Sequence, residues 1–115
     1  MVSDRNRIVV FTDEKMGTGP EELGVLLLRN FLKTIIRDKL LPRKIVCYNQ
    51  GVRLGTQGSP VLEELFELAK NGVELLFCGT CLDYYKSKDK LAVGKISNMG
   101  EIAKTLFEAD SIVTP

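Results

Sequence analysis

Short apolar runs alternate with longer amphipathic stretches along this chain. The short runs are rich in valine, isoleucine, leucine and phenylalanine, and their length and composition predict β-strands. The run at residues 73–77 lacks a regular alternation of polar and apolar positions, which is typical of a strand buried on both faces. The five predicted strands span residues 7–12, 44–48, 73–77, 91–93 and 111–114.

The amphipathic stretches predict helices. The first begins at Pro20, a residue that suits the first turn of a helix, and extends to about residue 38. The second has Ser59 as its cap and Pro60 as its first residue, and it ends near residue 69. The first helix carries a wide apolar stripe that we expect to be buried, formed by Leu23, Leu26, Leu27, Phe31, Ile35 and Ile36.

Two further helices follow in the second half of the chain. Residues 82–85 predict a short helix directly after the third strand. Asn98, with Glu101 three residues on, makes a capping pattern for a helix over residues 99–109. Strands and helices therefore alternate throughout, which predicts an α/β fold with a parallel five-stranded sheet and helices on both faces.

Right-handed crossovers place the loops that follow the strands at the carboxyl edge of such a sheet. These loops are residues 13–19, 49–58, 78–81 and 94–98. The second has ten residues with three glycines, which is long for a connection of this type. We expect a functional site in the crevice where the loops meet. With no repeat, low-complexity tract or linker, residues 1–115 predict a single domain.

Composition narrows the range of functions. Sixteen basic and fifteen acidic residues give a net charge of +1, without a basic stripe interleaved with aromatic residues, so nucleic acid is not an expected partner. No apolar run approaches the roughly 20 residues of a membrane helix, and the polar start of the chain lacks a signal-peptide core. Three cysteines, an odd number, argue for free thiols in a reducing cytoplasm.

The chain contains no histidine, which excludes Ser-His and Cys-His nucleophile pairs and histidine-ligated metal sites. Thiols, carboxylates, lysines and backbone amides remain for any chemistry. The glycines near Met16 have neither the spacing of a dinucleotide fingerprint nor a Walker lysine. They predict a tight turn, and we expect no cofactor.

The most informative motif is Cys78-Gly79-Thr80-Cys81, which lies between the third strand and a short helix. Unpartnered amides and the dipole at a helix start favour the thiolate, the form of cysteine that attacks sulfur or binds metal. The alternative is a purely structural role, in which the two cysteines are small buried residues, since free cysteines are often buried. Cys47, inside the second strand, is expected to be such a core residue.

Three chemistries compete for the cysteine pair. Zinc usually takes four ligands, so a single cysteine pair can hold it only if two subunits share the ion. The chain would then be an oligomeric metal-binding or small-ligand module. A dithiol/disulfide switch suits the spacing of a thioredoxin active site. However, that fold keeps a proline beside its dithiol, and here only Pro115 follows Cys81. A cysteine persulfide needs one activated thiolate and no general base. The residues alone leave all three open.

Several strings together resemble a known family. They are Lys15-Met16-Gly17, Glu22-Leu23-Gly24, Asn49-x-Gly51-Val52-x-Leu54, Gly58-Ser59, Cys78-Gly79-Thr80-Cys81-Leu82-Asp83-Tyr84-Tyr85, Leu91-Ala92-Val93-Gly94 and Ser97-Asn98-Met99. The set is similar to the C-terminal domain of the YedF proteins, which are sulfurtransferase-like proteins linked to selenium metabolism in the DsrE/DsrF-like superfamily. The resemblance covers nearly the whole chain. It implies a three-layer α/β/α sandwich of the flavodoxin-like topology class.

The same resemblance implies a function. It suggests a cytoplasmic carrier that relays sulfur or selenium through a cysteine persulfide. By motif position, Cys78 matches the superfamily cysteine and Cys81 is particular to the subgroup, whereas the expected helix start favours Cys81. The residues expected to line the site are Gly79, Thr80, Asn49, Gly51 and Asn98.

Partners follow from the resemblance as well. They are persulfide donor proteins and thiol acceptor proteins, and superfamily members often form trimers or hexamers, so a homo-oligomer is expected. Typical YedF proteins begin with a TusA-like domain. This chain begins six residues before the first predicted strand, so we expect that domain to be absent and to be a plausible partner.

Overall fold

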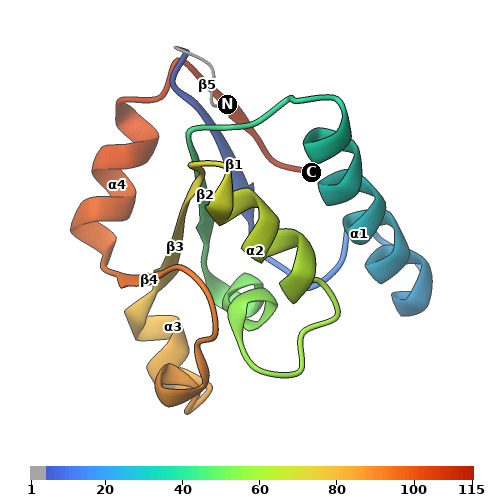
Figure 1. The fold of residues 1–115 in the computed structure, drawn as a ribbon. Coiled ribbons are helices and arrows are strands. Elements are labelled where there is room, and N and C mark those ends of the chain that lie inside the picture. Colours follow the sequence, from blue (N-terminus) through green and yellow to red (C-terminus); the bar gives the residue numbers. More distant parts are fainter. Residues whose placement is uncertain (1–4) are drawn as a thin grey trace.

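The computed structural model describes residues 5–115 and contains the parallel five-stranded sheet that the sequence predicts. The strand order is β4-β3-β2-β1-β5, and every neighbouring pair is parallel. The strands are β1 (Arg7–Phe11), β2 (Lys44–Cys47), β3 (Glu74–Cys78), β4 (Lys95–Ser97) and β5 (Ser111–Val113). The chain moves outward from β1 to β4 and then returns across the sheet to β5 (Figure 1).

Helices lie on both sides of the sheet and make the three-layer arrangement (Figure 1). The α-helices are α1 (Glu21–Arg37), α2 (Leu62–Lys70), α3 (Gly79–Tyr84) and α4 (Met99–Phe107). Two 3₁₀ helices, η1 (Asn49–Gly55) and η2 (Lys88–Lys90), complete the fold. Helices α1 and α2 pack side by side on one face, and α4 covers the other. Within residues 5–115, no helix combines the length and the apolar character that crossing a membrane requires.

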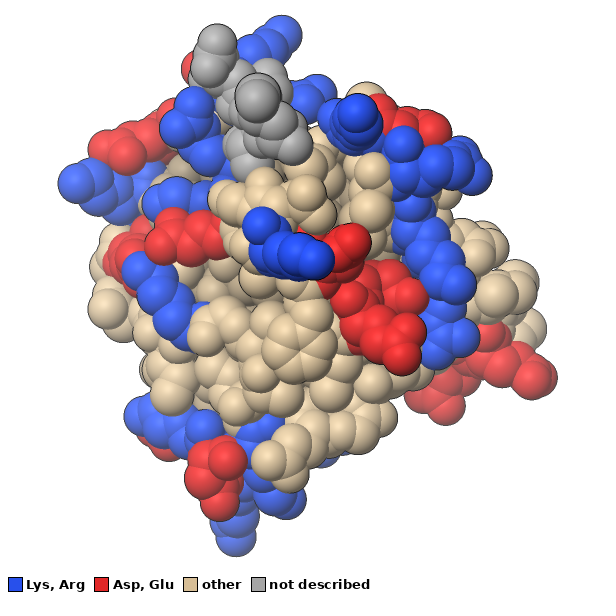
Figure 2. All heavy atoms as spheres, in the orientation of Figure 1, with Lys and Arg blue, Asp and Glu red and all other residues tan. Residues whose placement is uncertain are grey.

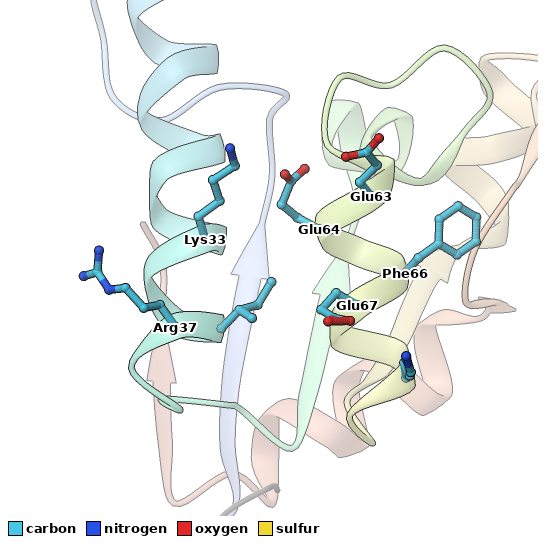
Figure 3. Close-up of a pocket in the computed structure, with 8 residues that line it drawn as sticks. Lys33, Arg37, Glu63, Glu64, Phe66 and Glu67 are labelled. Carbon is cyan, nitrogen blue, oxygen red and sulfur yellow. The ribbon is translucent and has the colours of Figure 1, made fainter.

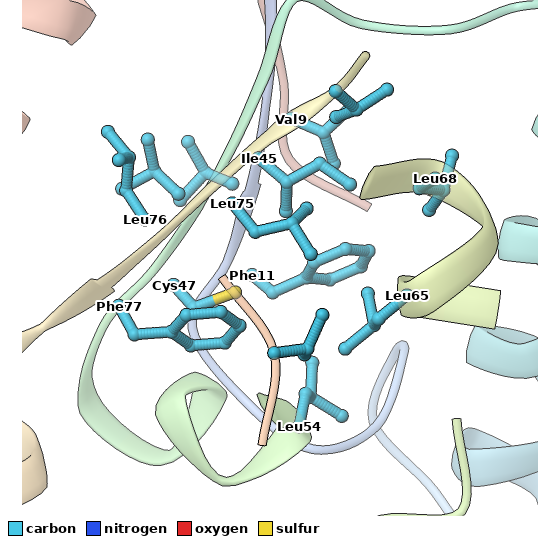
Figure 4. Packing of buried hydrophobic residues seen from close by; sticks show 14 of the residues in the cluster. Val9, Phe11, Ile45, Cys47, Leu54, Leu65, Leu68, Leu75, Leu76 and Phe77 are labelled. Carbon is cyan, nitrogen blue, oxygen red and sulfur yellow. The ribbon is translucent and has the colours of Figure 1, made fainter. Parts of the chain in front are cut away.

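The core lies between the sheet and its helices. The last four residues of both β1 and β3 are buried, which confirms that the central strands are covered on both faces. Figure 4 shows side chains of the strands, among them Leu75 and Phe77, packed with Leu65 and Leu68 of α2. Helix α1 buries a narrower stripe than expected, because Leu23, Leu26 and Leu27 are 42–51% exposed.

The prediction of the fourth strand was wrong. Residues 91–93 turn toward η1, where Leu91 forms an isolated antiparallel bridge with Thr56. Strand β4 lies further along, over Lys95–Ser97, beyond Gly94 in a left-handed conformation with φ of 74°. Because β4 is an edge strand with Lys95 and Ile96 exposed, it carries no apolar run by which a sequence pattern could detect it.

Two predicted helix starts were also wrong. Helix α2 begins at Leu62, because the Ser59 hydroxyl accepts a hydrogen bond from Val61 N at 3.2 Å and closes a turn ahead of the helix. Helix α3 begins at Gly79, three residues before the predicted start. The long connection after β2 is also more regular than expected, since its first seven residues form η1.

Candidate functional site

The cysteine motif lies where β3 passes directly into α3, at the carboxyl edge of the sheet (Figure 1). Cys78 is the last residue of β3 and the N-cap of α3, and Cys81 is the third residue of that helix. The 3₁₀ helix η1 packs against both β3 and α3. Two of the loops predicted to meet at this edge, 49–58 and 78–81, therefore do meet.

The two thiols of the motif differ in access. Cys78 is 1% exposed and pairs in register with Ser97 of the edge strand. Cys81 is half-buried, and its thiol lies within hydrogen-bonding contact of the Cys78 thiol. Cys47 is completely buried in the core, as the sequence predicts (Figure 4). All three cysteines are free thiols.

Asn49 connects the two sides of the site. Its backbone N–H donates a hydrogen bond to Cys81 Sγ at 3.1 Å. Its side-chain Oδ1 accepts a hydrogen bond from the Tyr85 hydroxyl at 3.2 Å. Asn49 has a positive φ of 54°, a conformation that asparagine tolerates better than most residues. The Arg53 guanidinium lies 4.6 Å from the centre of the Tyr85 ring, on its face.

A pocket of about 410 Å³ opens beside Cys81. Its walls are Asn49, Thr80, Cys81, Tyr84 and Tyr85. The two tyrosine rings stand nearly perpendicular with their centres 5.3 Å apart, and Tyr84 is 81% exposed at the rim. Cys81 is thus a thiol at the wall of an aromatic pocket, whereas Cys78 lies beneath it.

Two glycines hold η1 against the sheet. A Cβ on Gly51 would collide with the Phe11 carbonyl oxygen, and a Cβ on Gly55 would collide with the Phe77 ring. Only glycine allows this approach of backbone to backbone and backbone to ring. The close packing of η1 is what brings Asn49 to Cys81.

Burial has the largest effect on the ionisation of Cys81. It raises the pKa of this thiol above the ordinary value of 9.0, while the hydrogen bond from the Asn49 amide lowers it and the neighbouring Cys78 raises it. Helix α3 has only six residues, so its dipole is small. The sequence-based expectation of a thiolate favoured by the helix start is therefore not met in the free chain. Burial also raises the pKa of Cys47, far above its usual range.

The other residues expected to line the site lie in different places. Thr80 and Asn49 line the pocket. Gly79 is buried against β4, where a Cβ would meet the Ser97 carbonyl oxygen at 3.0 Å. Gly51 lies within η1, where it packs against the end of β1, and Asn98 caps α4 by accepting a hydrogen bond from Glu101 N at 2.9 Å. The sequence did not point to Arg53, because no motif marks a residue whose guanidinium stacks on a tyrosine ring far along the chain.

Another pocket, of about 540 Å³, lies between α1 and α2, and no cysteine lines it. Its lining includes Lys33 and Arg37 of α1 and Glu63, Glu64 and Glu67 of α2, and Figure 3 shows Arg37 pointing away from α2. Figure 2 shows basic and acidic side chains interspersed on the face it draws. Among residues 5–115, no group of three or more cysteine, aspartate and glutamate residues could hold a metal ion. Nucleophilic chemistry therefore points to the smaller pocket at Cys81.

Comparison with known proteins gives matches of two kinds. The model of the DsrE/DsrF-like family matches residues 23–115. Solved structures with the same fold include a protein of unknown function, MTH1491 from Methanobacterium thermoautotrophicum, with 25% identity and a TM-score of 0.68. That match covers 95% of this chain and 98% of the other.

Two more distant structures share the fold. The ychN protein from E. coli has 18% identity and a TM-score of 0.69, over 96% of this chain and 99% of its own. The conserved protein of unknown function BT1422 from Bacteroides thetaiotaomicron has 13% identity and a TM-score of 0.64, over 96% and 95% of the two chains. No curated protein sequence gives a significant match.

Proposed function

Because this chain belongs to the DsrE/DsrF-like family, we propose that it relays sulfur through a persulfide formed at the Cys78–Cys81 pair. The observation that carries the proposal is the contact between these two thiols, one of which lines an open pocket. The proposal includes selenium as an alternative cargo, since selenium follows the same chemistry of attack and transfer.

The chemistry requires only thiols. A cysteine thiolate of this chain attacks the outer sulfur of a donor persulfide, R–S–S–H. The bond between the two donor sulfurs breaks, the new bond forms to the cysteine, and the donor leaves as the thiolate R–S⁻. The outer sulfur moves with its proton, so no oxidant or reductant is consumed. A chain without histidine suits this reaction because no general base has to act on a poor nucleophile.

Intact-mass spectrometry tests the proposal. We expect the parent protein to gain the mass of one sulfur atom, about 32 Da, after incubation with a low-molecular-weight persulfide, and to lose it on addition of a thiol reductant. A Cys47→Ala variant should behave like the parent, because Cys47 is buried in the core. If neither the parent nor any single cysteine variant gains sulfur, the proposal is wrong.

A dithiol/disulfide switch is the second candidate, favoured by the same contact between the two thiols. In that case the useful state is the Cys78–Cys81 disulfide, formed with loss of two hydrogen atoms and no gain of sulfur. Equilibration with a glutathione couple distinguishes a reversible switch from a stable bond. A potential far below that of the cytosolic glutathione pool would exclude the switch. No contact in the described part of the chain favours the metal-binding module.

We further propose that the donor and the acceptor are proteins, a TusA-like domain among them, and that the chain forms a homo-oligomer. Exposed apolar side chains such as Ile96 and Met99, near the edge strand β4, support self-association. Light scattering during size-exclusion chromatography tests the oligomer. A monomer at all concentrations would contradict it.

A further inference from the structure

The two cysteines are unequal partners for an incoming donor. A thiol that attacks a persulfide must reach bonding distance of its outer sulfur. Cys81 lines the open pocket, whereas Cys78 is 1% exposed beneath it, at the junction of β3 and α3. A donor that enters the pocket therefore meets the sulfur of Cys81 first.

The sulfur of Cys81 is also held in place. The Asn49 amide donates to Sγ at 3.1 Å, and the Tyr85 hydroxyl donates to Asn49 Oδ1 at 3.2 Å. The Arg53 guanidinium stacks on the face of the Tyr85 ring, 4.6 Å from its centre. A hydrogen bond from a fixed amide stabilises a thiolate more than a thiol. Asn49 and Arg53 of η1 and Tyr85, the C-cap of α3, thus cooperate on one sulfur atom.

We infer that Cys81 is the thiol that accepts sulfur from the donor, and that Asn49, held by Tyr85, is its positioning residue. This inference rests on the proposed relay and reverses the assignment that motif position gives, in which Cys78 is the carrier. Access and hydrogen bonding around Cys81, rather than position in the motif, carry the reversal.

Cys78 then has a separate role. After transfer, Cys81 carries a persulfide, Cys81–S–S–H, whose inner sulfur lies beside the Cys78 thiol. Attack by the Cys78 thiolate on that inner sulfur forms the Cys78–Cys81 disulfide and releases hydrosulfide, HS⁻. The sulfane sulfur gains the two electrons that the two cysteines lose, so the step needs no external oxidant.

Several ionisable groups surround Cys81. Cys78 faces it from the end of β3, and Tyr84 of α3 and Tyr85, the C-cap of that helix, line the same pocket. Arg53 of η1 acts through the Tyr85 ring. Asp83 of α3 forms an ion pair with Lys88 of η2, with 3.0 Å between carboxylate and ammonium.

Peptide mapping of the persulfide locates the entry thiol. After incubation of the parent with a low-molecular-weight persulfide and capping by an alkylating reagent, we expect the added sulfur on Cys81. Cys81→Ser should lose uptake, and Cys78→Ser should keep it and retain the persulfide for longer. Uptake at Cys78 in Cys81→Ser overturns the inference while the relay stands, whereas no uptake by any form overturns both. Circular dichroism checks that each variant is folded.

The positioning role has its own test, which does not depend on sulfur transfer. The rate of iodoacetamide alkylation at Cys81, followed by mass spectrometry across pH, gives the apparent pKa of this thiol. We expect Tyr85→Phe to raise that pKa by about half a unit, because Asn49 is no longer held against Sγ. Asn49→Gly should give a similar shift, since glycine keeps the positive φ and the amide but cannot bind Tyr85.

Combining the two changes gives a sharper test. The double variant should shift no further than either single variant, because both remove the same interaction. Tyr48→Phe is the matched control, since it removes a hydroxyl from the residue next to Asn49, outside the pocket. The pKa of Cys81 in this variant should equal that in the parent. An unchanged pKa in Tyr85→Phe, or equal shifts in Tyr85→Phe and Tyr48→Phe, would overturn the positioning role.

Discussion

Gly55 at the end of η1 lies directly against the ring of Phe77 in β3, with no space for a Cβ between them. Gly94 approaches the same ring from the segment before β4, where a Cβ would lie 2.7 Å from Phe77 Cε2. The ring therefore fills the space between two backbone segments that flank the site. The position of η1, and with it that of Asn49, depends on this packing.

A methyl group at position 55 should disturb the packing. We expect Gly55→Ala to lower the free energy of unfolding by about 1–3 kcal/mol, as overpacking of a dense core usually does. Urea denaturation measures the change. Gln57→Ala, an exposed neighbour, is the control and should stay within about 0.5 kcal/mol of the parent.

A second variant separates overpacking from a backbone effect. Phe77→Leu leaves room for the new methyl group, so the double variant Gly55→Ala/Phe77→Leu should be more stable than the sum of the two single changes predicts. Strict additivity would show that Gly55 is needed for its conformation and not for the space it leaves.

The sequence predicted the parallel sheet because the apolar runs of β1, β2 and β3 are buried on both faces and leave a clear signal. The edge strand β4 gave no such signal, since Lys95 and Ile96 are exposed and only Ser97 is buried. The apolar residues 91–93 misled the prediction because Leu91 pairs with Thr56 instead of joining the sheet.

The sequence predicted that the cysteine pair follows the third strand, as it does, but the difference in exposure between Cys78 and Cys81 was not predictable. Whether Cys78 or Cys81 is exposed depends on a helix that starts at Gly79 and not at Leu82. The contact between Asn49 and Cys81 joins residues 32 positions apart, through the packing of η1 on the sheet. Asn49 was a candidate because of its loop, and its hydrogen bond to Cys81 became visible only in the fold.

The N-cap of α4 offers a test of local stability. Asn98 Oδ1 accepts a hydrogen bond from Glu101 N at 2.9 Å, and Asn98 has the extended conformation of a cap residue. We expect Asn98→Ala to lower the free energy of unfolding by about 1 kcal/mol. Asn98→Asp should keep most of the stability, because a carboxylate can accept the same bond. Thermal denaturation followed by circular dichroism measures both, and equal losses in the two variants would contradict the capping role.

Glu101 should contribute to stability in acid. The Ser97 hydroxyl donates a hydrogen bond to Glu101 Oε1 at 2.5 Å, and the Lys95 ammonium lies 3.2 Å from Oε2. The hydrogen bond from Ser97, followed by that from Lys95, lowers the pKa of Glu101 below its ordinary value of 4.5. A lowered pKa stabilises the folded chain above pH 4.5, and this contribution is lost as pH falls through the folded-state pKa.

Glu101→Gln removes that contribution. Because Glu101 is about one-third exposed and solvent screens the pair, we expect a loss below about 1 kcal/mol at neutral pH and a smaller difference from the parent in acid. Urea denaturation midpoints of the parent and the variant, measured above and below pH 4.5, give this difference in stability. A difference that does not change with pH would contradict the linkage.

Cys47 should limit stability in alkali. Burial raises the pKa of this thiol in the folded chain, whereas the unfolded chain titrates near the ordinary value of 9.0. Folding is therefore stabilised fully below pH 9.0, and stability falls as pH rises, because only the unfolded chain releases the proton. We expect the parent to lose about 1–2 kcal/mol from this thiol by about pH 10. Cys47→Ala, although less stable at neutral pH because of the cavity, should lose less over the same range. Urea denaturation under reducing conditions measures the two slopes, and parallel slopes would mean that Cys47 ionises without unfolding.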